Sequence, residues 1–454
     1  MTLDQIVNSQ KEFFNSNTTR SVSYRRHALE RLLHAIRENE SSIYAALKED
    51  LNKSEEEAYL TEVSTVTGEI KYALNHIDSW ARMKKVHTPL KLYPAKSYIV
   101  KEPYGVALII SPWNYPFQLA IAPLIGAIAA GNCAVIKPSK SSPVTSQVLA
   151  NIINTTFEKK YLYVLEQNYS YAEILDQPYD YIFFTGSERA GKQVMSAAAD
   201  RLIPVTLELG GKSPCIVDKS ADIDLTARKI MWGKVLNAGQ TCVAPDYVVV
   251  HSSIKEELVL KLREYCRQMV GDISENTKYP HIINLHHFMR LRNYIEREEH
   301  VLGGRCDEDA RVIEPAIFTE ATFDSPVMKE EIFGPILPII EYENLDDVID
   351  IIKHRAKPLA CYMFGQSNDF IVKVINELSF GGGCINDVII HVSNEHAPFG
   401  GVGASGMGHY HGKASFDTFT HEKSIVGSRS SIDIEMKYPP YTRENYQKMR
   451  KLLK

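Results

Sequence analysis

The amino-acid sequence predicts an α/β fold in which parallel sheets are flanked by helices. Short apolar segments alternate with helical segments from residue 105 onward, and the same alternation resumes after Gly211. Gly210 and Gly211 provide a break between the two runs, and a chain of 454 residues is too long for one ordinary hydrophobic core. We therefore expect two α/β domains with a boundary near residues 208–212.

Each predicted element follows from its pattern of apolar residues. Residues 22–85 are expected to be helical, because Leu29, Leu32, Leu33 and Ile36 recur at the spacing of one helix face. The first α/β run supplies strands and helices at 106–110, 117–130, 133–136, 181–184, 189–199 and 203–207. The second run supplies strands at 214–217 and 247–250, followed by helices that begin near residues 222 and 254.

Composition excludes several classes of function. The net charge is -5 without an internal basic cluster, so we expect no nucleic-acid partner. The longest apolar stretch, 117–130, is too short to cross a bilayer, and the charged tail at 435–454 is expected to be solvated rather than membrane-bound. Seven scattered cysteines without a Cys-x-x-Cys pair are typical of a reducing compartment. Because the amino terminus shows no signal-peptide pattern, the sequence predicts a cytoplasmic protein.

One cysteine and one glutamate have the surroundings of catalytic groups. Cys242 follows the small polar segment 239–241, which leaves backbone N–H groups available to stabilise a thiolate. Glu208 follows an apolar strand at the edge where α/β sites gather. A thiol and a separate carboxylate can trap a carbonyl carbon covalently and then release the product to water. Cys242 is the candidate nucleophile and Glu208 the candidate base, although each residue type taken alone is more often structural.

Three further polar groups lie between predicted strands and helices. Asn114 either caps its loop or donates a hydrogen bond to a developing oxyanion. The turn at Gly186 and Ser187 is expected to aim backbone N–H groups at an anion such as a pyrophosphate, although it lacks the G-x-G-x-x-G pattern. Lys137 follows the strand at 133–136 and is either solvated or a ligand of a ribose or phosphate.

Two other groups give weaker signals. The run 330–335, read alone, is typical of a solvated helix start at Glu331 with Phe333 in the core. Four histidines lie in or near a glycine-rich segment: His391, His396, His409 and His411. Their spacing matches no known ligand pattern, so we expect no metal site.

Taken together, these segments resemble the aldehyde dehydrogenase superfamily from Pro112 to Lys423. The resemblance is carried by five motifs in the family's order: Val135-Ile136-Lys137-Pro138-Ser139, Phe184-Thr185-Gly186-Ser187, Glu208-Leu209-Gly210-Gly211-Lys212, Gly239-Gln240-Thr241-Cys242, and 330–335. The run 398–417 is similar to that of the class 3 branch. That branch implies a homodimer that oxidises aromatic or medium- or long-chain aliphatic aldehydes to carboxylic acids.

The resemblance implies a role for each candidate residue. Cys242 would attack the aldehyde, Asn114 would hold the oxyanion of the thiohemiacetal, and Glu208 would activate the water that hydrolyses the thioester. The implied cofactor is NAD or NADP. The residues expected to contact this cofactor are Trp113, Lys137, Lys140, Gly186, Ser187, Glu331 and Phe333.

One position departs from the commonest NAD-using pattern of the family. The residue three places after the cofactor lysine is there a glutamate that accepts hydrogen bonds from the adenosine ribose, whereas here it is Lys140. A lysine does not repel a 2′-phosphate and offers it a cation. We therefore expect NADP to be accepted at least as well as NAD.

The resemblance also divides the chain. It implies a Rossmann-like cofactor-binding domain from residues 1–80 and 100–208, and an α/β catalytic domain from 209–410. Segments 81–99 and 411–440 would form a small oligomerisation extension that bridges subunits.

Three alternative functions stay open. A CoA-acylating aldehyde dehydrogenase passes the acyl group to a thiol, and Glu208 argues against it because that route needs no base for water. A cysteine esterase would reduce no nicotinamide on addition of an aldehyde, which absorbance measures directly. A non-catalytic structural protein would show no activity, and the presence of Cys242, Glu208 and Asn114 argues against it.

Overall fold

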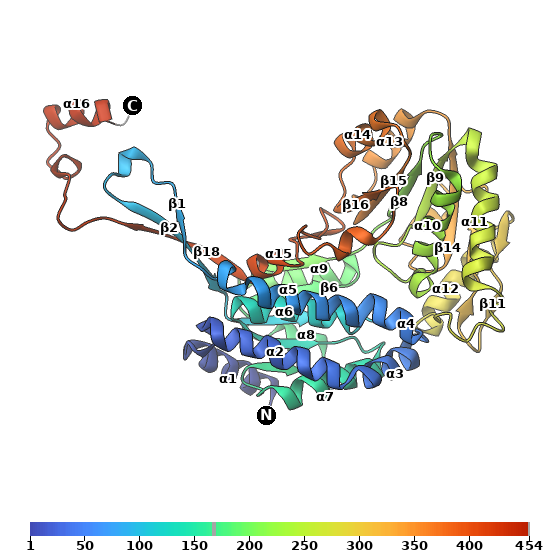
Figure 1. The fold of residues 1–454 in the computed structure, drawn as a ribbon, viewed down its shortest axis with the longest axis horizontal. Coiled ribbons are helices and arrows are strands. Elements are labelled where there is room, and N and C mark those ends of the chain that lie inside the picture. Colours follow the sequence, from blue (N-terminus) through green and yellow to red (C-terminus); the bar gives the residue numbers. More distant parts are fainter. Residues whose placement is uncertain (166–168, 453–454) are drawn as a thin grey trace.

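Two parallel sheets, each covered by helices, form the body of the protein, and a narrow arm projects from one side (Figure 1). The computed structural model describes residues 1–165 and 169–452. The α/β class predicted from the sequence is confirmed.

The amino-terminal third of the first unit is helical, as the spacing of Leu29 and Leu32 predicted. The helices are α1 (Leu3–Asn15), α2 (Val22–Glu38), α3 (Glu40–Leu51), α4 (Glu55–Ala58) and α5 (Ser64–Trp80). A π-helical turn, Tyr59–Val63, joins α4 to α5. The predicted helical region was too long at its carboxyl end, because α5 stops at Trp80 and strand β1 begins at Lys84.

The first sheet has the strand order β17-β7-β6-β3-β4-β5. Its strands are β3 (Val106–Ile110), β4 (Cys133–Lys137), β5 (Leu162–Val164), β6 (Tyr181–Thr185), β7 (Val205–Glu208) and β17 (Gly406–Met407). All pairs are parallel except β17 with β7. The strand predicted at 203–207 begins at Val205 and includes Glu208, so this carboxylate is on the last strand residue rather than after the strand.

The second sheet has the order β10-β13-β14-β9-β8-β15-β16, with only β10 antiparallel to its neighbour. Its strands are β8 (Pro214–Val217), β9 (Tyr247–His251), β10 (Val301–Gly303), β13 (Ala316–Phe318), β14 (Ile336–Tyr342), β15 (Ala360–Phe364) and β16 (Gly382–Ile385). A separate pair, β11 (Cys306–Asp307) and β12 (Val312–Ile313), lies outside it. The short apolar runs thus become central parallel strands, which are buried on both faces.

Helices connect the strands of both sheets. In the first unit these are α6 (Gln118–Ala130), α7 (Pro143–Thr156), α8 (Tyr171–Leu175), α9 (Glu188–Ala199) and α15 (Lys413–Thr418). In the second unit they are α10 (Ile223–Val235), α11 (Lys255–Val270), α12 (Leu285–Ile295), α13 (Leu345–Lys353) and α14 (Asn368–Glu377). The predicted helices at 117–130, 189–199, 222 and 254 correspond to α6, α9, α10 and α11.

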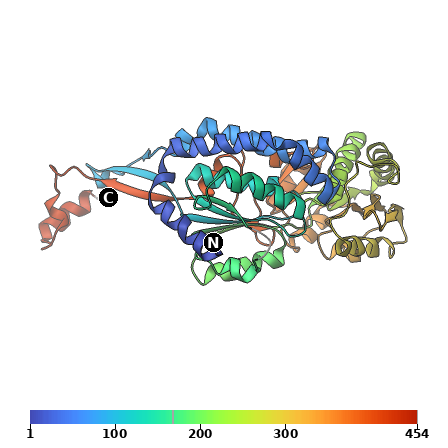
Figure 2. The ribbon, with the colours of Figure 1, turned by 90° about the horizontal axis from the view of Figure 1, so that it is seen from below.

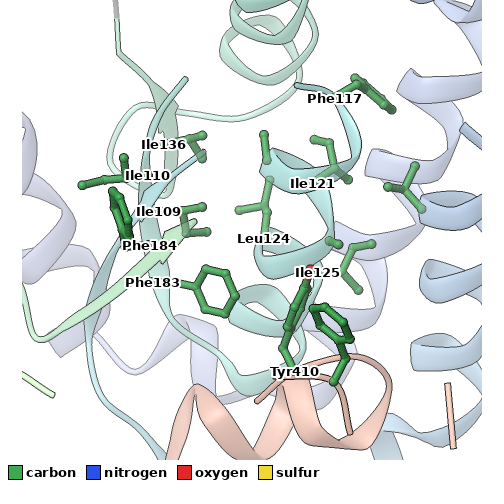
Figure 3. Packing of buried hydrophobic residues seen from close by; sticks show 14 of the residues in the cluster. Ile109, Ile110, Phe117, Ile121, Leu124, Ile125, Ile136, Phe183, Phe184 and Tyr410 are labelled. Carbon is green, nitrogen blue, oxygen red and sulfur yellow. The ribbon is translucent and has the colours of Figure 1, made fainter. Parts of the chain in front are cut away.

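The core of the first unit is built around α6, on which every residue is buried. A helix that is apolar on all sides must be surrounded by protein, and α6 contacts β3, β4, α2, α5 and α15. Figure 3 shows Leu124 of α6 facing Ile109 of β3, with Phe183 of β6 below them. Such a core holds the strand ends in fixed positions, and truncating one of its leucines to alanine typically costs about 2–5 kcal/mol.

The arm is a three-stranded antiparallel sheet of β1 (Lys84–Val86), β2 (Lys96–Pro103) and β18 (Thr420–Gly427), in the order β1-β2-β18. Figures 1 and 2 show it extending away from the body, with the tail helix α16 (Arg443–Leu452) at its far end. Among the described residues, no helix has both the length and the apolar character that a membrane crossing requires.

Candidate active site

The loop that carries Cys242 is held in an unusual backbone conformation between α10 and β9. Asn237 and Ala238 both have φ of 50°, and Gly239 has φ of 73°. A side chain at Gly239 would lie 2.3 Å from the carbonyl oxygen of Gly334, so only glycine fits there. The loop leaves Cys242 half-buried, whereas Cys133, Cys215, Cys266, Cys361 and Cys384 are buried and Cys306 is exposed.

The Cys242 thiol is protonated at neutral pH in this environment. Burial and, to a smaller extent, the neighbouring Glu331 and Glu208 carboxylates raise its pKa to about 12, although the backbone N–H groups of Cys242 and Val243 act in the opposite direction. The expectation that N–H groups of this loop stabilise a thiolate therefore holds only in part, because desolvation outweighs them. A thiol of this kind needs a base before it can act as a nucleophile.

Glu208 supplies a buried carboxylate at the end of β7. Its side chain is 2% exposed, and neither carboxylate oxygen accepts a hydrogen bond from any other described residue. Burial raises the pKa of Glu208 well above its usual value. Both Glu208 and Cys242 also raise the pKa of the buried Tyr410, so these three side chains lie in one region. An unpaired buried carboxylate beside a thiol has the properties of a general base.

Asn114 is joined to the loop of Cys242 by hydrogen bonds. Its Nδ2 donates to the Gln240 carbonyl oxygen at 3.0 Å, and its own carbonyl oxygen accepts from Asn237 Nδ2 at 2.8 Å. An amide nitrogen has two N–H donors, so one fixes the side chain and the second is left to donate elsewhere. The Asn114 residue therefore ties two loops together, and its second amide N–H has no hydrogen-bond partner among the described residues.

Unpartnered polar groups gather along the carboxyl edge of the first sheet. The hydroxyl oxygens of Ser111, after β3, and Thr185, at the end of β6, are buried and have no hydrogen-bond partner among the described residues. Lys137, at the end of β4, is half-buried, and burial and the nearby Lys140 lower its pKa. Doubly wound α/β folds bind nucleotides at this edge of the sheet. Unpartnered polar groups at this edge are therefore compatible with a bound nucleotide cofactor.

The turn after β6 begins α9, and one of the backbone N–H groups that was expected to face an anion is already bonded within the protein. The Gly186 N–H donates to the Glu208 carbonyl oxygen at 3.0 Å, and Ser187 caps α9 by accepting from the Ala190 N–H at 3.4 Å. A Cβ atom at Gly186 would lie 2.7 Å from the ring of Phe184, so the turn has little room for a side chain at this position. The N-terminus of α9 thus points toward the same edge of the sheet.

Two predicted cofactor residues, Trp113 and Phe333, meet although they are far apart in the sequence. Their rings pack edge to face at 5.3 Å and 83°, and Phe333 has φ of 49°. His287 of α12 packs on Trp113 at 5.3 Å and was missed by the sequence reasoning. Its Nδ1 has no hydrogen-bond partner among the described residues, and burial and Arg290 lower its pKa to about 4. No local pattern distinguishes this histidine.

Glu331 is brought against the segment that follows Glu208. A side chain at Gly210 would lie 2.2 Å from Glu331 Oε2, so this glycine makes room for the carboxylate. Although Glu331 is partly accessible, its desolvation and the nearby Asp246 raise its pKa to about 8. Lys212 holds the segment by an ion pair with Asp246 at 2.5 Å and a hydrogen bond to the Glu330 carbonyl oxygen at 2.9 Å. Glu331 is therefore not the solvated helix start that its run suggests when read alone.

Other predicted residues lie apart from this group. Lys140 is exposed, but its positive charge contributes to the lowered pKa of Lys137. His411 pairs with the buried Glu69 at 3.2 Å, and His396 and His409 are exposed. Within residues 1–165 and 169–452, no group of three or more His, Cys, Asp or Glu side chains is placed to hold a metal ion.

Comparisons with known proteins identify the family to which the sequence is similar. The model of the aldehyde dehydrogenase family matches residues 1–425. The chain is 49% identical over 443 residues to 4,4′-diaponeurosporen-aldehyde dehydrogenase of Staphylococcus aureus, covering 97% of this chain and 96% of the relative. It is 43% identical over 442 residues to the dimeric NADP-preferring aldehyde dehydrogenase of Mus musculus, covering 96% and 98%. A solved structure of the substrate-bound state of Staphylococcus aureus AldH matches with a TM-score of 0.97 and 47% identity over 100% of both chains.

Proposed function

The chain belongs to the aldehyde dehydrogenase family, and from that membership we propose how its residues carry out the oxidation of an aldehyde with NAD or NADP. The reaction class and the cofactors follow from the family, whereas the role of each residue is our proposal. The observation that supports it best is the buried Glu208 carboxylate. It accepts no hydrogen bond from another described residue, and its charge contributes to the raised pKa of Cys242.

Cys242 is the nucleophile in this proposal. Because its thiol is protonated at rest, a neighbouring base has to accept the proton as Sγ attacks the carbonyl carbon, and Glu208 is the nearby base of raised pKa. The bond between sulfur and carbon converts the carbonyl oxygen to an oxyanion. The second N–H of Asn114 and the backbone N–H of Cys242 donate to it, and together they stabilise the thiohemiacetal.

The residues at the carboxyl edge of the first sheet fit a dinucleotide. Lys137 and Glu331 would hold ribose hydroxyls, the turn at Gly186 and Ser187 would face the pyrophosphate, and Lys140 would lie near the adenosine ribose. The packed rings of Trp113 and Phe333 would form a wall beside the nicotinamide. When bound, NAD or NADP would supply a hydride acceptor for the C–H bond of the thiohemiacetal, and loss of that hydride would leave Cys242 as a thioester.

Water then releases the acid. Glu208 first releases to solvent the proton that it took from Cys242. It then accepts a proton from the attacking water, the oxygen of that water bonds to the thioester carbon, and the bond between carbon and Cys242 Sγ breaks. The departing Sγ takes this proton from Glu208, which restores the thiol and the carboxylate. The oxyanion donors act a second time at this step. The unpaired state of Glu208 supports this role, because a carboxylate committed to an ion pair is a weaker base.

We infer that the substrate is an aromatic or medium- or long-chain aliphatic aldehyde and that the enzyme is a homodimer. Ile425 and Val426 of β18 are exposed by 43% and 55% on the projecting arm, and β18 is the edge strand of its sheet. A second copy that pairs with this edge would cover both side chains. All seven cysteines are free, which supports a reducing compartment such as the cytoplasm.

An aldehyde panel tests the proposed function. Benzaldehyde, hexanal, a long-chain alkanal and 4,4′-diaponeurosporenal should be assayed with NAD and with NADP, by absorbance of the reduced cofactor. We expect reduction by wild type and none by Cys242→Ala, and no dependence on added coenzyme A. A wild-type protein that reduces neither cofactor, or that requires coenzyme A, would reject the proposal. Light scattering at several protein concentrations tests the dimer.

A further inference from the structure

A buried ion pair lies behind the loop that carries Asn114. The Lys53 ammonium donates to Glu62 Oε1 at 2.6 Å, and both side chains are fully buried. Moving two charges out of water costs several kcal/mol for each ion, so such a pair is poor evidence for stability by itself. None of the catalytic steps above uses this pair. The residues to which Lys53 and Glu62 are hydrogen-bonded indicate its function.

Lys53 fixes the backbone around Asn114. Its ammonium donates to the Asn114 carbonyl oxygen at 2.9 Å and lies 3.9 Å from the ring centroid of Tyr115, within range of a cation–π contact. Together with the hydrogen bond to Glu62, the ammonium makes three interactions, and a lysine has three N–H donors. Two consecutive residues of the oxyanion loop are thus anchored to one side chain.

Glu62 anchors the far end of the same loop. Its Oε2 accepts hydrogen bonds from the backbone N–H groups of Phe117 at 2.9 Å and Gln118 at 3.1 Å, where α6 begins. Glu62 lies in the π-helical turn Tyr59–Val63, and single π turns inside helices are frequent at functional sites. The ion pair therefore holds the loop at its middle and at its end.

The network reaches the loop of Cys242 through Asn237. Asn237 Nδ2 donates to the carbonyl oxygens of Asn114 at 2.8 Å and Gln240 at 3.1 Å, and the Asn237 N–H donates to Glu57 Oε1 at 2.7 Å. The Asn114 amide donates to the same Gln240 oxygen. The position of the Asn114 side chain relative to Cys242 thus depends on shared hydrogen bonds.

We propose that Lys53, held by Glu62, is a positioning residue that fixes the Asn114 amide for the oxyanion formed at Cys242. This inference rests on the proposed role of Asn114. Without Lys53, Asn237 is the one donor that the Asn114 carbonyl oxygen keeps among the described residues. A shift of about 1 Å near reacting groups can cost about 10²-fold in rate. Because Asn237 remains, we expect Lys53→Met to lower kcat by about 10- to 100-fold, less than Asn114→Ala.

A double-mutant cycle tests whether Lys53 acts through Asn114. We expect that Lys53→Met lowers kcat no further in the Asn114→Ala background, because the donor it positions is already gone. Additive losses in the double variant would overturn the inference, as would a Lys53→Met enzyme with unchanged kcat. In both cases a loss in Asn114→Ala alone would leave the proposed function intact. If Asn114→Ala keeps full kcat, the oxyanion role fails first and the inference fails with it.

Two further variants separate positioning from stability. Lys53→Met/Glu62→Gln removes both members of the buried ion pair, so we expect it to recover melting temperature but not kcat; recovery of both would overturn the inference. It also replaces Lys53→Met in the cycle if the single variant does not fold. Arg25, buried at the other end of α6, donates to the Ala129 carbonyl oxygen at 3.2 Å. Arg25→Met should lower the melting temperature without lowering kcat; an equal loss of kcat would mean that any loosening of α6 slows the enzyme.

Discussion

Replacing Glu208 by glutamine tests the proposed base with little disturbance of packing. The carboxamide has nearly the shape of the carboxylate, so no cavity forms. Neither oxygen of Glu208 accepts a hydrogen bond from another described residue, and no ion pair is broken there. Any change in rate therefore reports the loss of a proton acceptor rather than the loss of structure.

The expected loss of turnover follows from the role of a general base. Removing it typically costs about 10²–10⁴-fold in rate. In the proposed reaction Glu208 also accepts the thiol proton of Cys242, so formation and release of the acyl group should both slow. Rapid mixing should therefore show slow reduction of the cofactor without an initial burst.

Stability should change in the opposite direction to activity. Burial raises the pKa of Glu208 in the folded protein above the value of about 4.3 in an unfolded chain. Between these two pKa values the folded state binds more protons than the unfolded state, so wild-type stability falls with rising pH, by up to about 1.4 kcal/mol per pH unit from this group. Glu208→Gln lacks this loss, so it should be the more stable protein at pH 7 and lose that advantage near pH 4.

Stopped-flow absorbance and thermal unfolding at both pH values measure these effects. Glu12→Gln, which removes an exposed carboxylate of α1, is the matched control and should change neither quantity. An unchanged steady-state rate in Glu208→Gln would remove Glu208 from the mechanism. A lower melting temperature at pH 7 would show that the carboxylate has a stabilising partner.

Four other outcomes are expected. Cys242→Ala should abolish turnover but keep cofactor binding, measured by fluorescence titration; residual turnover would point to another nucleophile. Alkylation of wild-type Cys242 by iodoacetamide should quicken about tenfold per pH unit from pH 7 to 9, because its pKa is about 12, and a plateau there would show a resting thiolate. Asn114→Ala should lower kcat by about 10²–10³-fold with cofactor affinity little changed, and a large fall in melting temperature alone would favour the loop-capping role. Lys140→Glu should weaken NADP by about 1.5–3 kcal/mol in kcat/KM without a parallel change for NAD, and Lys219→Glu, on the exposed surface, serves as its control.

Local patterns in the sequence determined the elements and the chemistry of single residues. The apolar runs at 106–110 and 214–217 became β3 and β8 to the residue, because a buried strand needs only a short continuous apolar segment between turns. The motifs around Cys242 and Glu208 identified a thiol and a carboxylate, and the family they resemble was confirmed by the match over residues 1–425. These features depend on neighbours along the chain, so the sequence contains them directly.

Only the tertiary structure decided which groups meet and which are desolvated. Lys53 precedes an acidic run and reads as a surface residue, yet it is buried against Glu62 and the Asn114 carbonyl oxygen. Glu331 likewise reads as solvated, but it lies against Gly210 with its pKa raised to about 8. Burial and ion pairing depend on which elements, distant in the sequence, pack together in space. The local periodicity of apolar residues does not show which elements these are. Because burial sets the pKa of the thiol and of the base, the fold rather than the motif sets the protonation states on which the proposed reaction depends.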